Sequence, residues 1–283
     1  MRFEELTHPY FIGEIGINHN GDIQIAKKLM DAAFACNWDC VKFQKRNPDV
    51  CVPEKQKGVI RDTPWGQMTY LDYKYKVEFG KEEYDFISEY AQRKPIDWSV
   101  SVWDIDSLKF ISEYNVPFIK IPSSHITNNE LILEVCKTNL PIAISTGMST
   151  ISEIDKAVEI ILSNSDCKPL IMHCNSSYPT PRDEMNLRNI ITLQDRYDCP
   201  IGYSGHEDDL MPSSIAISLG VKVVERHITL SHELWGTDQK SSLEIMGMDM
   251  LKKRSDDIEI ILGSYEKTVT KSELPIREKL RKL

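Results

Sequence analysis

The sequence of 283 residues lacks features that mark several protein classes. No stretch approaches the roughly 18 uninterrupted apolar residues that a membrane helix needs, and the N-terminal segment has no apolar core like that of a signal peptide. There is no excess of positive charge, because 43 acidic residues against 34 Lys and Arg give a formal net charge of -9. We therefore expect a cytoplasmic protein that binds neither membranes nor nucleic acid.

Cysteine pairs are also missing. The seven cysteines are odd in number and include no Cys-x-x-Cys motif, so neither a disulfide framework nor a structural zinc site is predicted. Most of them are expected to be small buried hydrophobic residues. Only Cys174 lies in a segment with functional signals, and nothing in the sequence supplies it with an activating base, which disfavours a nucleophilic role.

Eight short apolar runs rich in β-branched and aromatic residues recur along the chain, and amphipathic stretches with helical spacing lie between them. The runs are residues 10–18, 40–45, 98–103, 118–123, 141–146, 170–174, 201–206 and 223–228; the amphipathic stretches include 23–36, 82–92, 151–162 and 212–219. This alternation predicts a parallel sheet. Eight units in this length favour an α/β fold of the (β/α)8 (TIM) barrel type, with one domain over 1–283. No Gly-x-Gly-x-x-Gly turn follows the first run, which disfavours a doubly wound sheet with a second domain.

Two segments depart from this alternation. Residues 46–80 form a long irregular connection after the second predicted strand, and we expect a lid, a binding loop or an interface there. Residues 264–283 contain Pro275 and several basic residues, and are predicted to form a terminal helix or tail.

Polar side chains interrupt the C-terminal ends of the predicted strands, where barrel strands are normally apolar. These residues are Glu14, Lys42, Gln44, Ser101, Lys120, Ser145, His173, His206, Glu225 and His227. A single one of them is best explained as a structural polar group satisfied by its neighbours, because an unpaired buried charge costs several kcal/mol. For the whole set a functional role is favoured, since barrel active sites collect at the C-terminal ends of the strands.

The residue types in this set suggest two kinds of ligand. Lys42 and Lys120 place two ammonium groups in an acidic chain, which favours a phosphate or carboxylate ligand such as a small phosphorylated acid. Short hydroxyl donors accompany them at Ser101, Ser123, Ser145 and Thr146. His206 and His227 end consecutive strands and suit one divalent ion, Mn²⁺, Fe²⁺, Co²⁺ or Zn²⁺. The alternative is that each imidazole only bonds a loop or a backbone carbonyl.

Seven motifs carry a family resemblance. They are Glu14-Ile15-Gly16-Ile17-Asn18-His19-Asn20-Gly21, Lys42-Phe43-Gln44, Lys120-Ile121-Pro122-Ser123, Ser145-Thr146-Gly147-Met148, His173-Cys174-Asn175-Ser176-Ser177-Tyr178-Pro179, Gly202-Tyr203-Ser204-Gly205-His206 and Glu225-Arg226-His227. In this order they resemble the motifs of the sialic acid synthase (N-acetylneuraminate synthase) family. The resemblance extends from about residue 10 over almost the whole chain, and no single motif would have sufficed.

The resemblance implies condensation of phosphoenolpyruvate with N-acetylmannosamine or a related amino sugar, giving a nine-carbon 3-deoxy-2-keto acid and phosphate. It also implies residue roles. Lys42, Ser101, Lys120, Ser123 and Ser145 would hold phosphoenolpyruvate, with Gly147 nearby and Ser176 and Tyr178 at the rim. His206 and His227 would bind a divalent ion, commonly Mn²⁺ in this family, with Mg²⁺ or Co²⁺ as alternatives. Glu14, Gln44, Tyr178 and Asp238 would engage the sugar or water on the ion, with Glu14 or Glu225 as the acid or base. A homodimer is implied as well.

Three departures from the family pattern affect acceptor recognition. Many relatives carry a C-terminal antifreeze-like domain that supplies an arginine to the partner's sugar site, and no such domain is expected after residue 283. The barrel, a separate polypeptide or residues 46–80 of a neighbouring subunit would then recognise the acceptor. Asn175 replaces a more usual Thr, and residues 122–125 replace a Gly-Ser-Gly-acidic run. Sialic, legionaminic, pseudaminic and Kdn-type products therefore all stay open.

Two other functions compete with the synthase. A Schiff-base aldolase would use Lys120 as nucleophile, because a desolvated lysine near another cation has a lowered pKa. The histidine pair and the second lysine argue against it. A noncatalytic sugar-acid-binding protein is the third possibility, and the retention of Glu14, both lysines and both histidines argues against that.

Overall fold

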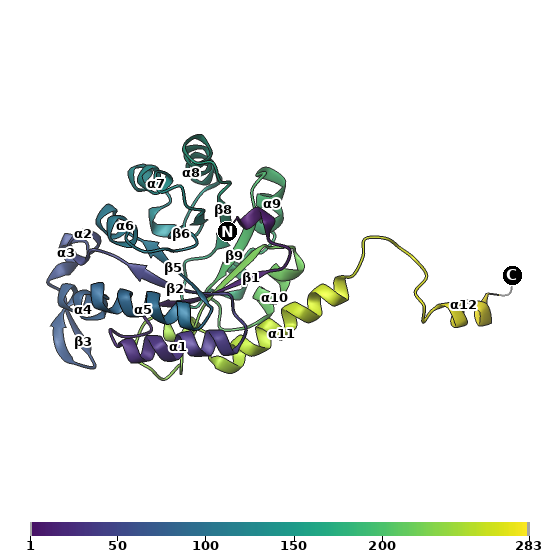
Figure 1. The fold of residues 1–283 in the computed structure, drawn as a ribbon, viewed down its shortest axis with the longest axis horizontal. Coiled ribbons are helices and arrows are strands. Elements are labelled where there is room, and N and C mark those ends of the chain that lie inside the picture. Colours follow the sequence, from purple (N-terminus) through teal and green to yellow (C-terminus); the bar gives the residue numbers. More distant parts are fainter. Residues whose placement is uncertain (1, 282–283) are drawn as a thin grey trace.

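The computed structural model describes residues 2–281 and contains a closed barrel of eight parallel strands, ringed by helices (Figure 1). Around the barrel the strands follow the order β1-β10-β9-β8-β7-β6-β5-β2. They are β1 (Tyr10–Gly16), β2 (Cys40–Lys45), β5 (Asp97–Val102), β6 (Ile119–Ile121), β7 (Ile142–Ser145), β8 (Leu170–Cys174), β9 (Ile201–Gly205) and β10 (Val223–His227). The predicted single-domain (β/α)8 barrel is confirmed, with strand ends shifted by two residues at most.

The helices that follow the strands form the outer ring. They are α1 (Ile23–Ala35), α5 (Lys81–Arg93), α6 (Ile105–Ile111), α7 (Asn129–Cys136), α8 (Ile151–Asn164), α9 (Asn189–Arg196), α10 (Met211–Ser218) and α11 (Ile245–Leu262). Side-chain caps fix several starts: Asp22 accepts from the amide of Gln24 at α1, and Thr150 with Glu153 forms a capping box at α8. Across residues 2–281, every helix is too short or too polar to traverse a bilayer.

The segment 46–80, predicted to be irregular, contains regular structure, which corrects the sequence analysis. It folds into α2 (Pro48–Cys51), α3 (Glu54–Lys57), an antiparallel hairpin of β3 (Ile60–Thr63) and β4 (Gly66–Thr69), and α4 (Tyr70–Val77). These elements are too short for periodicity to reveal them. Trp235, in the loop after β10, packs against Tyr73 and Trp65, with ring centroids 5.2 and 5.8 Å apart. The segment therefore packs against the loop that follows β10.

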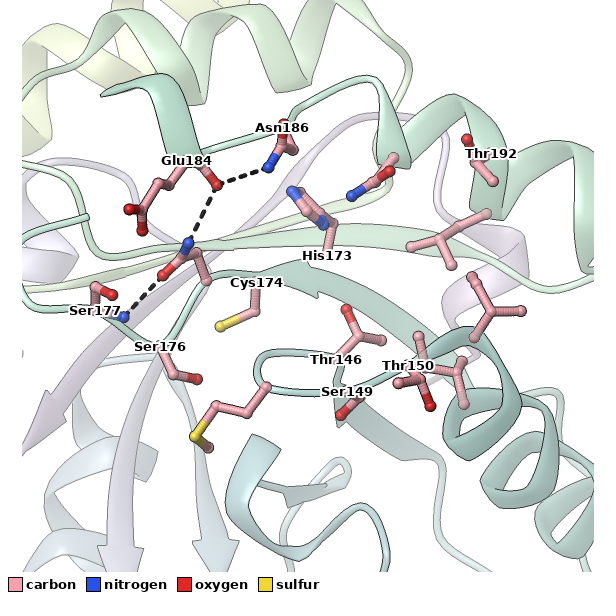
Figure 2. Close-up of a pocket in the computed structure, with 16 residues that line it drawn as sticks. Thr146, Ser149, Thr150, His173, Cys174, Ser176, Ser177, Glu184, Asn186 and Thr192 are labelled. Carbon is pink, nitrogen blue, oxygen red and sulfur yellow. Dashed lines mark hydrogen bonds between the residues drawn. The ribbon is translucent and has the colours of Figure 1, made fainter. Parts of the chain in front are cut away.

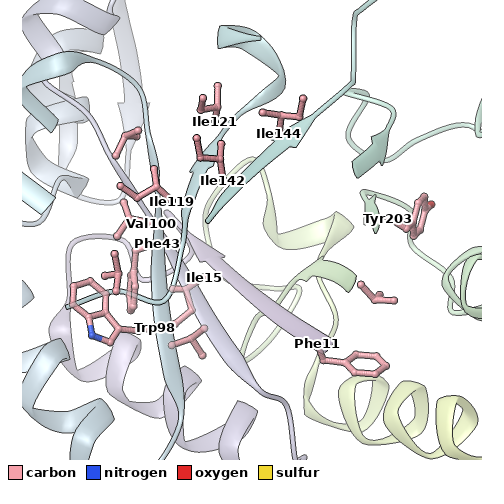
Figure 3. Close-up of a cluster of buried hydrophobic side chains, with 14 of the residues drawn as sticks. Phe11, Ile15, Phe43, Trp98, Val100, Ile119, Ile121, Ile142, Ile144 and Tyr203 are labelled. Atoms are coloured by element: carbon pink, nitrogen blue, oxygen red, sulfur yellow. The ribbon is translucent and has the colours of Figure 1, made fainter. Parts of the chain in front are cut away.

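Successive side chains of each strand point to opposite faces of the barrel, and they form two separate hydrophobic cores. Outward side chains such as Phe11, Val100 and Ile144 pack against the helices (Figure 3). Inward side chains at the start of the strands form a second apolar cluster, which includes Ile12, Cys40, Phe118, Ala143, Leu170, Met172 and Val223. Phe3, from a short 3-10 helix before β1, closes this cluster with its ring 5.3 Å from that of Phe118. The barrel is therefore filled with apolar side chains at its N-terminal end.

Beyond α11 the chain leaves the barrel as an exposed arm that carries the short helix α12 (Leu274–Leu280) (Figure 1). The terminal helix predicted within 264–283 is therefore present, and residues 282–283 lie outside the described part of the chain.

Candidate active site

A cavity of about 220 Å³ lies at the C-terminal ends of the strands, and side chains from all eight strands or the loops after them line it. The predicted site residues in its wall are Glu14, Lys42, Gln44, Ser101, Lys120, Ser123, Ser145, Ser176, Tyr178, His206, Glu225 and His227. Alternation along the strands brings these side chains together. Glu14, Lys42, Lys120 and Glu225 each lie two residues after an inward-facing member of the apolar cluster at the base, so they also point into the barrel.

Two carboxylates and two lysines alternate at the centre of the cavity, all of them buried. Glu225 Oε1 accepts a hydrogen bond from Lys120 Nζ at 2.9 Å and lies 3.6 Å from Lys42 Nζ. Lys42 also forms an ion pair with Glu14 and donates to Ser101 Oγ at 2.7 Å. The pairing keeps the charges compensated, so that an anionic substrate would find two ammonium groups already in position.

The environment drives the pKa values of the two carboxyl groups apart. Burial raises the pKa of Glu14, and the Glu225 charge adds to this, against the opposing effect of Lys42. Burial also acts to raise the pKa of Glu225, but Lys120 and Lys42 outweigh it and lower that pKa to about 2. For Lys120, burial lowers the pKa despite the Glu225 carboxylate. Glu225 is thus held as a carboxylate, whereas Glu14 is the group that can carry a proton.

Gln44 and Arg46 continue the polar wall toward the rim. Gln44 Nε2 donates to Glu14 Oε1 at 2.9 Å, and its carbonyl oxygen accepts from Arg46 Nη2. The guanidinium of Arg46 stacks on Trp103, 4.7 Å from the ring centroid, and pairs with Glu78 at 3.6 Å. A continuous line of polar contacts therefore leads from Glu14 at the centre to Arg46 at the edge.

The two predicted metal-binding histidines are neighbours. The rings of His206 and His227 lie 5.5 Å apart between centroids. His206 Nδ1 lies 2.6 Å from the carbonyl oxygen of Asn175, so this nitrogen carries a proton, and in the neutral ring Nε2 keeps its lone pair, beside Tyr178 OH at 2.8 Å. Nδ1 of His227 is buried without a hydrogen-bond partner in the described chain, and burial lowers the pKa of this imidazole to about 3.

These histidines suit an open metal site rather than a closed one. Between residues 2 and 281, no three His, Cys, Asp or Glu side chains come close enough together to enclose an ion. Asp238, assigned to substrate contact, does not line the cavity, and its Oδ2 lies 4.0 Å from His227 Nδ1. If an ion binds here, the two adjacent imidazoles would be its donors, and further coordination positions would be left to substrate or solvent.

Gly147 lies behind the cavity wall rather than in it. Its amide donates to Ser123 Oγ at 3.1 Å, and a Cβ at this position would lie 2.2 Å from Ser176 Oγ and 2.8 Å from Ser123 Oγ. The absence of a side chain at Gly147 therefore allows the two hydroxyl groups to converge at the cavity wall.

His173 does not join the catalytic cavity, unlike the other polar strand ends. It lies among the residues of a neighbouring cavity of about 780 Å³ (Figure 2). Its Nε2 is 2.8 Å from the carbonyl oxygen of Met185. Hydroxyl and amide groups dominate this second cavity, which includes Thr146, Ser177 and Asn186 and contains no Lys or Arg. The two cavities share Met148, Cys174 and Ser176.

Six residues of the cavity wall were not predicted as site residues: Trp103, Pro122, Ser124, Met148, Cys174 and Ser204. Ser204 donates to Glu225 Oε1 at 3.2 Å, and Trp103 lines the cavity beside Arg46. Cys174 has its sulfur 3.8 Å from His206 Nδ1; burial raises the pKa of this thiol, but His206 and Lys120 outweigh that effect and the pKa is lowered. Alternation in β9 places Ser204 on the inward face, so this residue could have been predicted from the sequence.

Comparison with known proteins places the chain in a family. The NeuB family model matches residues 29–267. N-acetylneuraminate-9-phosphate synthase of Mus musculus is 36% identical over 281 residues, which cover 97% of this chain and 77% of that protein. N,N'-diacetyllegionaminic acid synthase of Legionella pneumophila is 34% identical over 280 residues, with coverage of 96% and 78%. The crystal structure of an N-acetylneuraminic acid synthetase from Leptospira borgpetersenii, in complex with citrate, superposes with a TM-score of 0.87 and 29% identity over 98% of this chain and 94% of that one. The chain belongs to the NeuB family.

Membership of this family confirms the resemblance found in the sequence and defines the class of activity. The chain is an enzyme, a nonulosonic acid synthase that condenses phosphoenolpyruvate with a sugar. This excludes the noncatalytic binding protein and the Schiff-base aldolase as its primary function. The relatives are named for different nonulosonic acid products, so identity of about 35% does not by itself select the acceptor.

Proposed function

We propose that the chain joins phosphoenolpyruvate to N-acetylmannosamine or a closely related N-acetylhexosamine, giving a sialic-acid-type 3-deoxy-2-keto acid and inorganic phosphate. The observation that carries the proposal is the buried cluster of Lys42, Lys120, Glu14 and Glu225 beside the histidine pair, all in one cavity. Two ammonium groups match the carboxylate and phosphate of phosphoenolpyruvate, and the imidazoles lie where an aldehyde can be bound and polarised.

In this proposal Lys42 and Lys120 hold the two anionic groups of phosphoenolpyruvate. The hydroxyl of Ser145 supports this role, because it is buried in the cavity wall and has no hydrogen-bond partner among residues 2–281. A ligand oxygen would supply that partner. Ser101 and Ser123 add further hydroxyl groups on the same side of the cavity.

Carbon–carbon bond formation follows from this placement. C3 of phosphoenolpyruvate bonds to the aldehyde carbon, the carbonyl oxygen takes a proton, water adds at C2, and the bond from C2 to the phosphate oxygen breaks. Glu14, with its raised pKa, is suited to deliver the proton, and a general acid of this kind contributes about 10² to 10⁴ in rate. Glu225 stays ionised and fixes the positions of both lysines.

A divalent ion, which we propose to be Mn²⁺, would be held by His206 and His227 and would supply Lewis-acid polarisation of the aldehyde. Asn175 supports this by orienting His206 through its carbonyl oxygen. We expect chelation by EDTA to abolish turnover, and Mn²⁺, Co²⁺ or Mg²⁺ to restore it to different extents. Full turnover after exhaustive chelation would refute the metal assignment.

We also propose a cytoplasmic location, in keeping with the seven cysteines, which are all free thiols. The test of the whole proposal is the product formed from phosphoenolpyruvate, Mn²⁺ and a panel of hexosamines, with phosphate release measured and products identified by mass. A product mass equal to acceptor plus phosphoenolpyruvate plus water minus phosphoric acid supports the proposal. Absence of phosphate release across the panel would overturn it.

A further inference from the structure

A buried ion pair lies directly behind the two predicted metal-binding histidines. Glu207 follows His206 in the loop after β9, and Arg226 precedes His227 in β10. Arg226 Nη1 lies 2.9 Å from Glu207 Oε1, and both side chains are completely buried. Neither residue lines the catalytic cavity. Because side chains alternate along a strand, Arg226 points outward between the inward-facing Glu225 and His227. The pair therefore lies behind the cavity wall.

Further hydrogen bonds join this ion pair to the surrounding elements. Glu207 Oε1 accepts from Ser213 Oγ of α10 at 2.7 Å, and Oε2 accepts from Tyr203 OH of β9 at 2.8 Å. Arg226 Nη1 donates to Ser213 Oγ and to the carbonyl oxygen of Asp209, each at 3.0 Å. Nη2 donates to the carbonyl oxygen of Glu207. The guanidinium of Arg226 therefore ties β10 to α10 and to the loop after β9.

Backbone pairing between β9 and β10 stops short of the two histidines. It ends at Gly205 and Arg226, one residue before each of them. The backbone of His227 is held by its pairing with β1, whereas the contacts of His206 lead to the loop after β8. The ion pair between Glu207 and Arg226 therefore continues the connection between β9 and β10 beyond the last backbone pair, to the position of the histidines.

Stability alone does not account for this ion pair. Burial of two charges is costly, and apolar residues of similar volume are often as stabilising as a buried ion pair or more so. The sequence nevertheless makes room for the pair. A Cβ at Gly205 would lie 2.4 Å from Glu207 Oε2 and 2.7 Å from Cε1 of Tyr203, so the glycine allows the Glu207 side chain to fold back toward Arg226. The pair is best explained by the geometry that it specifies.

We propose that Glu207 and Arg226 are positioning residues that hold His206 and His227 at the separation that a divalent ion requires. This inference rests on the proposed function, which assigns the ion to the two imidazoles. The rings lie 5.5 Å apart between centroids, and Nδ1 of His227 has no hydrogen-bond partner within residues 2–281 that would fix its ring. Glu207 and Arg226 act through the backbone beside each histidine and touch neither ion nor substrate. Loss of groups that orient metal ligands typically weakens metal binding about 10- to 100-fold.

The test measures metal binding rather than turnover. The dissociation constant of Mn²⁺ is determined for the full chain without substrates, from the EPR signal of the free ion, and His227→Ala shows the level of binding without the site. The double variant Glu207→Met with Arg226→Met should fold, because both partners of the pair are replaced by apolar side chains, and should bind Mn²⁺ about 10- to 100-fold more weakly than the wild type. Asp155→Met with Arg196→Met is the matched control. It removes an exposed pair at 2.6 Å between α8 and α9 and should keep the wild-type dissociation constant.

Denaturant unfolding of the same variants separates positioning from a purely structural role. Weaker Mn²⁺ binding by a double variant of near wild-type stability supports the inference, and a folded double variant with the wild-type dissociation constant overturns it.

A second variant decides the matter if the double variant does not fold. Glu207→Gln keeps the size and the hydrogen-bonding groups of the side chain but removes its charge: binding weakened about 10-fold supports the inference, and unchanged binding overturns it.

Failure of the proposed metal site has a different signature. Wild type that binds Mn²⁺ no better than His227→Ala overturns the assignment of the ion to the histidines, and this inference with it. Release of phosphate from phosphoenolpyruvate then still tests the synthase reaction separately.

Discussion

The barrel interior contains two layers that differ sharply although they come from adjacent inward positions of the same strands. The layer at the base is apolar and sealed by Phe3, whereas the layer two residues further along each strand consists of Glu14, Lys42, Lys120 and Glu225. Burial of each large apolar side chain contributes about 1.5–3 kcal/mol, while burial of ionisable groups opposes folding. The burial of the apolar layer at the base therefore offsets the cost of the charged layer that lies directly above it.

The largest expected effect concerns the base layer. Phe118→Ala should lower the free energy of unfolding by about 3–5 kcal/mol, because it removes the ring that packs against Phe3 and leaves a cavity. Denaturant unfolding measures the change. We expect the KM for phosphoenolpyruvate of the folded variant to stay near that of the wild type. A Phe118→Ala protein with wild-type stability but weaker binding of phosphoenolpyruvate would contradict the view that the base layer stabilises the fold and the charged layer binds the substrate.

The next effect concerns the charged layer. Lys120→Ala should lower kcat/KM for phosphoenolpyruvate by about 10² to 10³, because it removes a preorganised cation at the reacting centre. Saturation kinetics at fixed sugar concentration measure it. Lys45→Ala is the control, since Lys45 pairs with Glu78 at 3.0 Å and does not line the cavity. Equal losses in both variants would argue against a specific role for Lys120.

The charged layer should also respond to acid. The folded-state pKa of Glu225, about 2, is below its ordinary value, so this group contributes stability that is present above about pH 4.5 and is lost as the pH falls toward 2. The slope from this group is at most about 1.4 kcal/mol per pH unit. Unfolding free energies of wild type and Glu225→Gln, measured from pH 6 downward, should converge in that window. A difference in unfolding free energy between the two proteins that does not change with pH would refute the lowered pKa of Glu225. The pKa of Glu14 is raised, so the difference in unfolding free energy between wild type and Glu14→Gln should change with pH in the opposite direction.

The smallest effect is expected at the rim. Tyr178 is 44% exposed, and its hydroxyl lies 2.8 Å from Nε2 of His206. Tyr178→Phe removes one hydrogen bond of about 0.5–1.5 kcal/mol, so kcat/KM for the acceptor should fall by about 2- to 10-fold. Kinetics with varied acceptor measure the change. A loss above 100-fold would mean that the hydroxyl acts directly in the chemistry.

The sequence was sufficient to predict the barrel and most of the cavity wall. Alternation places Glu14, Lys42, Lys120 and Glu225 on inward faces, and eight repeated units close the sheet, so their convergence follows from topology. His173 was predicted with the same reasoning but lies in the neighbouring cavity. It precedes the inward Cys174 by one residue, so the strand directs its side chain to the other face.

Pairing between distant residues was not predictable. Nothing in the local sequence indicates that Glu225 bonds Lys120 at 2.9 Å rather than its neighbour Arg226, which pairs with Glu207 instead. The short elements in 46–80 were also missed, because elements of four to eight residues leave little periodic signal. The position of Lys74 over the rings of Tyr70 and Tyr73 was not predictable either, because residues 46–80 were expected to be irregular.

The order of residues along each strand is enough to predict which side chains face the interior and at which end of the barrel the ionisable groups gather. That information is carried by a period of two residues within each strand, which any strand pairing preserves. Only the tertiary structure decided which carboxylate holds which lysine, how far apart the pKa values of Glu14 and Glu225 lie, and that Arg226 pairs with Glu207. Those properties depend on distance and desolvation between segments that are far apart in the chain, and neither is encoded in the local pattern.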